Sequence, residues 1–173
     1  MADLQTISER ADLEKVAVAY VGDGNNVANS LLNAFAVLGG ELRLATPRTH
    51  QPARQVRQSA TALAAASGAR ILFTEDPVEA VRGAHFVYTD VWASMGQEAE
   101  ADERMLVFTP YQVTQDLVEA AAEHVVVLHC LPAHRGQEIA AEVIDGPRSA
   151  VWDQAENRLH TQKALLLRLF GAA

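Results

Sequence analysis

The chain has 173 residues, of which 49% are hydrophobic and 21% charged, and its formal net charge is −8 at pH 7. This size and composition fit one soluble domain with a sizeable core, or one domain and a small remainder. The acidic balance and the scattered Lys and Arg residues argue against a nucleic-acid surface. A single cysteine excludes an intrachain disulfide and favours a reducing compartment, and no apolar run approaches the roughly 20 residues of a membrane span. We therefore expect a cytoplasmic protein.

Strand-like and helix-like patterns alternate along the whole chain. Short apolar runs predict strands at 16–21, 42–45, 71–74, 85–89 and 125–128. Amphipathic patterns and caps predict helices at 3–14, 27–38, 53–67, 76–83, 114–123 and 156–170. We expect residues 90–104 to form a loop that runs into a helix, and residues 150–152 to form an irregular strand. The alternation predicts a doubly wound, mainly parallel α/β sheet of about five strands, Rossmann-like, with helices on both faces.

Three polar segments directly follow predicted strands, at 22–26, 90–96 and 129–136. In open parallel sheets, ligands bind outside the carboxyl ends of the strands. These segments are therefore the candidate binding segments.

The first of them, Gly-Asp-Gly-Asn-Asn at 22–26, suggests a dinucleotide-binding turn, which two features disfavour. Val27 replaces the third glycine of that fingerprint, and the second strand ends at Thr46 without an acid for a ribose hydroxyl. Two interpretations remain: a turn with a helix cap, or a pair of carboxamides that bind a polar ligand.

The second segment combines an acid, a hydroxyl and a glycine-terminated turn. Asp90 could hold an ammonium group, while Ser94 and backbone N–H groups could hold a carboxylate. The alternative is a flexible polar loop, although Met95 would be an unusual choice for an exposed loop.

The third segment, His-Cys-Leu-Pro at 129–132, carries the only cysteine. Cys130 could be a small buried hydrophobe or part of a Cys–His nucleophile pair, although no acyl-transfer signature surrounds it. Common zinc spacings are absent, so we expect no metal site. Farther on, Arg158 lies either in an exposed first turn of the last helix or within reach of the site as an anion clamp.

Together, these motifs resemble those of the ornithine carbamoyltransferase family. The matching pieces are Gly-Asp-Gly-Asn-Asn at 22–26, Asp-Val-Trp-Ala-Ser-Met-Gly at 90–96, His-Cys-Leu-Pro at 129–132 and Glu-Asn-Arg at 156–158. The resemblance covers essentially the whole chain, but only the second half of the family's chain. It implies carbamoyl transfer from carbamoyl phosphate to the δ-amino group of L-ornithine, without a cofactor or metal.

The resemblance also implies roles for particular residues. The ornithine head would be held by Asn26, Asp90, Ser94 and Met95. Cys130 would manage the proton of the attacking amine, the Leu131 carbonyl would accept from the carbamoyl NH₂, and Cys130, Leu131 and Arg158 would contact carbamoyl phosphate. In the family the bond between Leu131 and Pro132 is cis. An amine attacks only when it is neutral, so the thiol could serve as acceptor if its surroundings lowered its pKa from about 8.5.

The family's phosphate-binding Ser-x-Arg-Thr-Arg and His-Pro-x-Gln motifs do not occur in this sequence. We therefore expect residues 1–14 to be an inter-domain helix left from a missing carbamoyl-phosphate domain. Residues 15–155 would form the ornithine-binding domain, and residues 156–173 a helix that packs back on the missing domain. The chain alone should be inactive, and the intact protein a homotrimer or a multiple of trimers. We also expect an exposed apolar patch on the two terminal helices, formed by Leu4, Ile7, Leu165, Leu166 and Leu169.

Three other functions compete with this one. A non-catalytic amino-acid-binding module would bind ornithine without turnover. A transcarbamylase for putrescine or N-acetylornithine is a close rival, although the Ser-Met-Gly loop at 94–96 suits an α-amino acid head that putrescine lacks. A nucleotide-dependent oxidoreductase is disfavoured by Val27 and Thr46.

Overall fold

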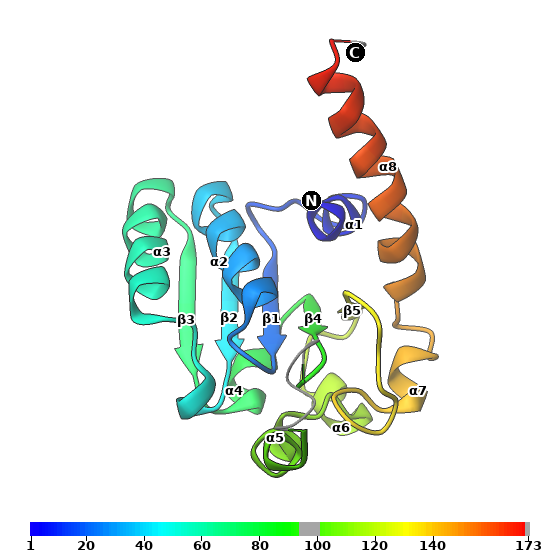
Figure 1. Cartoon of the computed structure of the whole chain (residues 1–173). Coiled ribbons are helices and arrows are strands. Elements are labelled where there is room, and N and C mark those ends of the chain that lie inside the picture. The colour runs from blue at the N-terminus through cyan, green and yellow to red at the C-terminus, as the bar shows by residue number, and fades with distance from the viewer. Residues whose placement is uncertain (94–100, 172–173) are drawn as a thin grey trace.

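The computed structural model describes residues 1–93 and 101–171, and its centre is a five-stranded parallel sheet (Figure 1). The strands are β1 (Ala17–Val21), β2 (Glu41–Ala45), β3 (Arg70–Thr74), β4 (Phe86–Thr89) and β5 (Val126–His129). Their spatial order is β3-β2-β1-β4-β5, and every neighbouring pair is parallel. The predicted doubly wound α/β fold is thereby confirmed.

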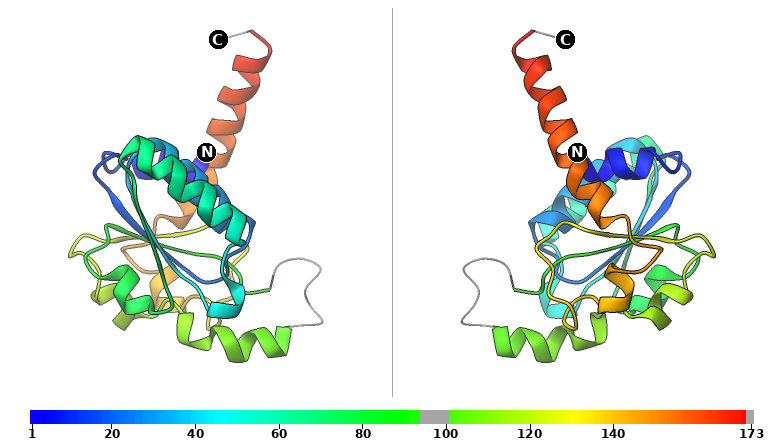
Figure 2. Two further views of the ribbon diagram at one scale, coloured as in Figure 1. Left: turned by 90° about the vertical axis from the view of Figure 1, so that its left-hand side faces the viewer. Right: turned by 90° about the vertical axis from the view of Figure 1, so that its right-hand side faces the viewer.

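Helices cover both faces of the sheet, as Figure 2 shows. One face carries α1 (Ala2–Ser8), α2 (Asn26–Leu38) and α3 (Arg54–Ser67). The other carries α4 (Pro77–Val81), α5 (Ala101–Phe108), α6 (Gln115–Glu119) and α7 (Ala141–Ile144). The last helix, α8 (Val151–Leu169), starts beside β5 and projects beyond the body of the domain. Two apolar clusters, one on each side of the sheet, form the core.

The strand order places a switch point between β1 and β4. From β1 the chain winds outward through β2 to β3, then returns to the other side of β1 and winds outward through β4 to β5. The loops after β1 and β4 therefore diverge to opposite faces and leave a crevice at the carboxyl ends of these strands. The candidate segments at 22–26 and 90–96 begin at this crevice, and the segment at 129–136 begins beside it.

The last helix differs from its prediction. It begins at Val151, so residues 150–152 are not a strand. The first turns of α8 bury Val151, Gln154 and Asn157, which are spaced three residues apart and share one face. Two of these three buried side chains are amides, so the inward face carried no hydrophobic signal.

The first helix also differs. It ends at Ser8, because the N–H groups of Arg10 and Ala11 turn back to the carbonyl of Ile7. Ile7, which we expected to be exposed, is fully buried, since α1 packs between the sheet and α8. Leu4 is half-buried, whereas the leucines near the end of α8 are exposed as expected.

Within residues 1–93 and 101–171, no helix combines the length and the apolar character that crossing a bilayer requires.

Candidate functional site

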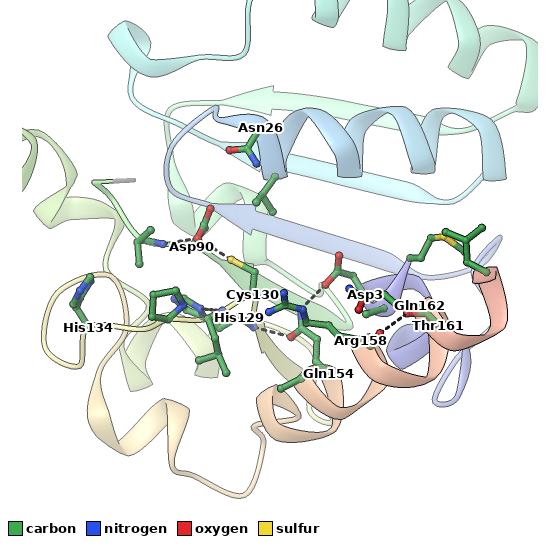
Figure 3. Close-up of a pocket in the computed structure, with 18 of the residues that line it drawn as sticks. Asp3, Asn26, Asp90, His129, Cys130, His134, Gln154, Arg158, Thr161 and Gln162 are labelled. Atoms are coloured by element: carbon green, nitrogen blue, oxygen red, sulfur yellow. Dashed lines mark hydrogen bonds between the residues drawn. The ribbon is translucent and has the colours of Figure 1, made fainter. Parts of the chain in front are cut away.

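A pocket of about 730 Å³ opens at the carboxyl ends of the central strands. Its walls come from the start of α1, the loops after β1, β4 and β5, and one side of α8. Figure 3 shows Asp90 and Cys130 together at its floor, Asn26 on the side of α2, and Arg158 on α8. This is the place where a doubly wound sheet binds its ligand.

The two loops that meet at the switch point are joined by Asn25 and Asp90. The Asn25 side chain caps α2 by accepting from the N–H groups of Val27 and Ala28. Its Nδ2 then donates to Asp90 Oδ2 at 2.7 Å. Asn25 is therefore both a helix cap and the group that orients the acid, while the exposed Asn26 faces the pocket. Both interpretations of this segment therefore hold: Asn25 is the helix cap, and Asn26, which the family resemblance assigns to the ligand, lines the pocket.

Gly24 is explained by the protein's own backbone. A Cβ on this residue would collide with backbone atoms of His50, Gln51 and Pro52, and its N–H donates to the His50 carbonyl at 2.8 Å. The glycine thus allows the loop after β2 to lie against the turn. No pyrophosphate is needed to account for it, which agrees with the rejection of a dinucleotide site.

Cys130 is held next to Asp90. Its Sγ donates to Asp90 Oδ1 at 2.8 Å, and the same oxygen accepts from the N–H of Val91. Burial, followed by the negative charge of Asp90, raises the pKa of the Cys130 thiol far above its ordinary value. The thiol is therefore protonated at neutral pH. The surroundings do not lower its pKa, as the amine chemistry would have required.

The turn after β5 has an unusual backbone. Leu131 has a φ of +56°, in the left-handed region, and the Leu131–Pro132 bond is cis. The Leu131 N–H donates to His129 Nδ1 at 2.9 Å, and the His129 N–H donates to Gln154 Oε1 at 2.9 Å. The turn is thus held both by its own imidazole and by α8.

A polar network that the sequence did not reveal lies behind Cys130. Gln154 Nε2 donates to Asp3 Oδ1 at 2.6 Å, and the Tyr88 hydroxyl donates to the same oxygen at 3.2 Å. Asp3 and Gln154 line the pocket, and Tyr88 is fully buried on β4. The sequence gives no signal for this network, because Asp3 and Tyr88 belong to expected regular elements and Gln154 lies before the expected start of the last helix. Only their meeting in space makes them part of the site.

A buried ion pair supports the loops on the α5 side. Arg104 pairs with Asp23 and also donates to the Trp92 carbonyl, and both charged side chains are almost fully buried. Burial raises the pKa of Asp23, and the Arg104 guanidinium partly offsets this. The pair connects the turn after β1 with the segment after β4.

Five of the predicted site residues line the pocket. They are Asn26, Asp90, Cys130, Leu131 and Arg158. Ser94 and Met95 lie outside the described residues. Among residues 1–93 and 101–171 there is no cluster of three His, Cys, Asp or Glu side chains that could hold a metal ion.

Fold and site together define an α/β ligand-binding domain, with an acid, amides, a thiol and a guanidinium around one pocket. Comparison with known families gives this class a name. A family model described as "Aspartate/ornithine carbamoyltransferase, Asp/Orn binding domain" matches residues 14–169. The chain belongs to this family.

Individual relatives and solved structures that resemble the chain carry the same family name. An ornithine carbamoyltransferase of Synechocystis sp. is 51% identical over 172 residues, which cover 99% of this chain and 56% of the relative. The structure of ornithine carbamoyltransferase from Pyrococcus furiosus has a TM-score of 0.91 at 53% identity, over 96% of this chain and 53% of that one. The anabolic enzyme of Campylobacter jejuni has a TM-score of 0.93 at 34% identity, over 99% and 57%. The chain thus spans about half the length of the curated relatives it matches.

Proposed function

We propose that this chain is the ornithine-binding part of an ornithine carbamoyltransferase. That enzyme transfers a carbamoyl group from carbamoyl phosphate to the δ-amino group of L-ornithine, giving L-citrulline and phosphate in arginine biosynthesis. One observation carries the proposal. At the switch point, Asp90 accepts a hydrogen bond from the Asn25 side chain and another from the Cys130 thiol. The names of the relatives support it.

The amino-acid head is assigned to the β1–β4 side of the pocket. Asp90 supplies a carboxylate for an ammonium group, and Asn26 offers amide donors for a carboxylate. Ser94 and Met95 complete this set by resemblance alone. A ligand with both an α-amino and an α-carboxyl group would use all four residues, whereas putrescine would leave the amide side unpaired.

Cys130 is assigned to the attacking amine. A lysine-like amine is mostly protonated at pH 7 and must lose a proton before it attacks. An ammonium group near Asp90 would offer donors to the same carboxylate that the thiol now uses, and would neutralise its charge. This would remove the second cause of the raised pKa of Cys130. We propose that ligand binding thereby brings the thiol closer to serving as a proton acceptor.

Carbamoyl phosphate is assigned to the far end of the pocket. The Leu131 carbonyl, Cys130 and Arg158 would contact it, and most of its phosphate charge would be met by another domain. Residues 1–14 and 156–173 would join or contact that domain, and residues 15–155 would form the ornithine-binding domain. We propose a cytoplasmic homotrimer, or a multiple of trimers, for the intact protein.

Calorimetric titration and a citrulline assay test the proposal. The chain should bind L-ornithine and norvaline, and Asp90→Asn should weaken ornithine binding about tenfold or more, because a charge-assisted hydrogen bond is lost. Asp116→Asn, an exposed acid on α6, is the matched control and should bind normally.

The chain alone should give no useful turnover, because the Ser-x-Arg-Thr-Arg segment that binds phosphate in the family does not occur in it. Mixing it with a separately expressed carbamoyl-phosphate domain of a relative should restore citrulline formation. If the mixture binds ornithine but forms no citrulline, the chain is better described as a non-catalytic amino-acid-binding module. Tighter binding of putrescine or N-acetylornithine than of ornithine would identify that amine as the substrate. Binding of NAD without affinity for ornithine would refute the proposal.

A further inference from the structure

A buried acid on the loop after β5 is not explained by the roles given so far. Glu138 has no exposed surface, and its Oε1 lies 3.2 Å from His129 Nε2. The His129 side chain is equally buried. Burying a carboxylate costs several kcal/mol, and an apolar pair of the same size is often as stable or more so. A buried acid at this place is therefore better explained by a conformation it enforces than by stability.

The hydrogen bonds show which conformation that is. His129 Nδ1 accepts from the Leu131 N–H at 2.9 Å, so the neutral ring carries its proton on Nε2. The Nε2–H then donates to Glu138 Oε1. The acid thus selects the only neutral tautomer that leaves Nδ1 free to accept. Without an acceptor at Nε2, the other tautomer would place an N–H against the Leu131 N–H.

The bond at Leu131 matters because this residue has a φ of +56°. A leucine in the left-handed region is disfavoured by roughly 1–2 kcal/mol and needs support from its surroundings. The hydrogen bond from the Leu131 N–H to His129 Nδ1 supplies such support, directly after Cys130. We propose that Glu138 is a positioning residue: through His129 it fixes the backbone of the Cys130–Leu131 turn and so the arrangement of the thiol and the Leu131 carbonyl.

A second role of Glu138 must be separated from this one. Its Oε1 also accepts from the His134 N–H at 2.5 Å, which closes its own loop. Its Oε2 lies 3.8 Å from His134 Nδ1 and has no hydrogen-bond partner in the described part of the chain. An acid that only closed the loop would not control the His129 tautomer. The test therefore reads the tautomer and the Leu131 amide directly.

Nuclear magnetic resonance on the full chain provides this test. Long-range ¹H–¹⁵N spectra should show His129 as the Nε2–H tautomer alone, while the exposed His124 serves as an internal control with both tautomers. Glu138→Leu should mix the His129 tautomers and speed exchange of the Leu131 amide about tenfold, as expected for one lost hydrogen bond. Glu138→Gln, which keeps an acceptor oxygen, should retain both properties.

A double-mutant cycle separates the two roles. His129→Phe should speed Leu131 exchange as Glu138→Leu does, and combining both changes should add nothing further. Asp145→Asn is the matched control. This exposed acid at the end of α7 pairs with Arg135 and does not contact His129. Exchange of the β1 amides reports whether each variant is folded.

Four results would overturn the inference. They are an Nδ1–H tautomer in the unmodified chain, unchanged Leu131 exchange in Glu138→Leu, faster exchange in Glu138→Gln to the same extent, and additive effects in the double variant. The first measurement needs no variant, so a failure of Glu138→Leu to fold leaves the inference testable.

The meaning of the turn for carbamoyl transfer rests on the proposed function. If that function holds, Glu138→Leu in the complemented enzyme should lower kcat on the order of 100-fold and change the KM for ornithine much less, because only the reacting groups are misplaced. An unmodified enzyme that forms no citrulline would refute the function, whereas the tautomer and exchange measurements would still decide the role of Glu138.

Discussion

Cys130 donates its thiol hydrogen to the carboxylate of Asp90, with Sγ 2.8 Å from Oδ1. The acid follows β4 and the cysteine follows β5, which are neighbouring parallel strands. Parallel pairing therefore brings two distant residues to one edge of the sheet. The contact stabilises the neutral thiol, because a thiolate would lie beside a negative charge in a buried site.

Removing the charge of Asp90 should make Cys130 more reactive. Burial is the larger cause of the raised pKa of Cys130 and the Asp90 charge the second, so Asp90→Asn should lower this pKa without restoring its ordinary value. The rate of alkylation by iodoacetamide at pH 8 should rise roughly tenfold for each pH unit by which the pKa falls. Mass spectrometry of the single cysteine gives the rate.

The control for this experiment is Asp116→Asn, which removes one negative charge far from the thiol. It should alkylate at the rate of the unmodified chain. A faster rate in both variants would point to net charge, and an unchanged rate in Asp90→Asn would show that the hydrogen bond does not control the thiol.

The sequence predicted those parts of the site that depend on strand ends. Periodicity places Asp90 and Cys130 directly after buried strands, and parallel pairing then brings them together. It could not predict Gln154, because this buried amide reaches the site from the first turn of a helix whose start was placed too late. It also missed the role of Asp3, whose partners Tyr88 and Gln154 are distant in sequence. Polar side chains buried by tertiary contacts leave no hydrophobic period.

Removing the arginine of the buried Arg104–Asp23 pair should cost far more stability than removing the arginine of a surface pair, and this cost should depend on pH. Arg104→Met leaves a buried carboxylate without its partner, which should cost about 3–5 kcal/mol near pH 8. Burial already raises the pKa of Asp23 above the ordinary 3.8, and loss of the guanidinium raises it further. The folded chain then binds this proton more tightly than the unfolded chain. The destabilisation caused by Arg104→Met should therefore shrink as the pH falls from the raised pKa of Asp23 toward its ordinary value of 3.8.

Urea unfolding of Arg104→Met and the unmodified chain at about pH 8 and about pH 5 measures this difference. Arg135→Met is the control, because Arg135 and its partner Asp145 are both about half exposed and the pair should be worth less than about 1 kcal/mol. Arg135 lowers the pKa of Asp145, so that pair loses its contribution as the pH falls. An equal loss at both pH values in Arg104→Met would contradict the assignment of the buried charge.

Two glycine substitutions should separate stability from ligand binding. Gly24→Ala forces a Cβ into the backbone of 50–52 and should cost about 1–3 kcal/mol while displacing Asn25 and Asn26. Gly68→Ala meets no neighbour within 4 Å but occupies a left-handed position, with a φ of +83°, and should cost about 1–2 kcal/mol. Only Gly24→Ala should weaken ornithine binding in calorimetry. Equal affinities in the two variants would show that the turn does not position the pocket amides.

The exposed leucines near the end of α8 should make the chain associate with itself. Leu166 is 53% exposed, Leu169 71% and Phe170 82%, and Leu165 and Leu167 are exposed as well. All five lie at the end of α8, which projects beyond the body of the domain (Figure 1). Apolar surface of this kind is normally covered. Sedimentation velocity should therefore show species that grow with protein concentration.

Replacing Leu166 and Leu169 together by lysine should shift the chain toward monomer. If each leucine contributes about 1.5 kcal/mol on burial, association should weaken on the order of 100-fold. Val37→Lys is the matched control, because Val37 is 63% exposed on α2, away from α8. The double variant should keep its affinity for ornithine, since neither leucine lines the pocket. A chain that is monomeric at every concentration, or that Val37→Lys dissociates equally well, would show that this surface does not drive association.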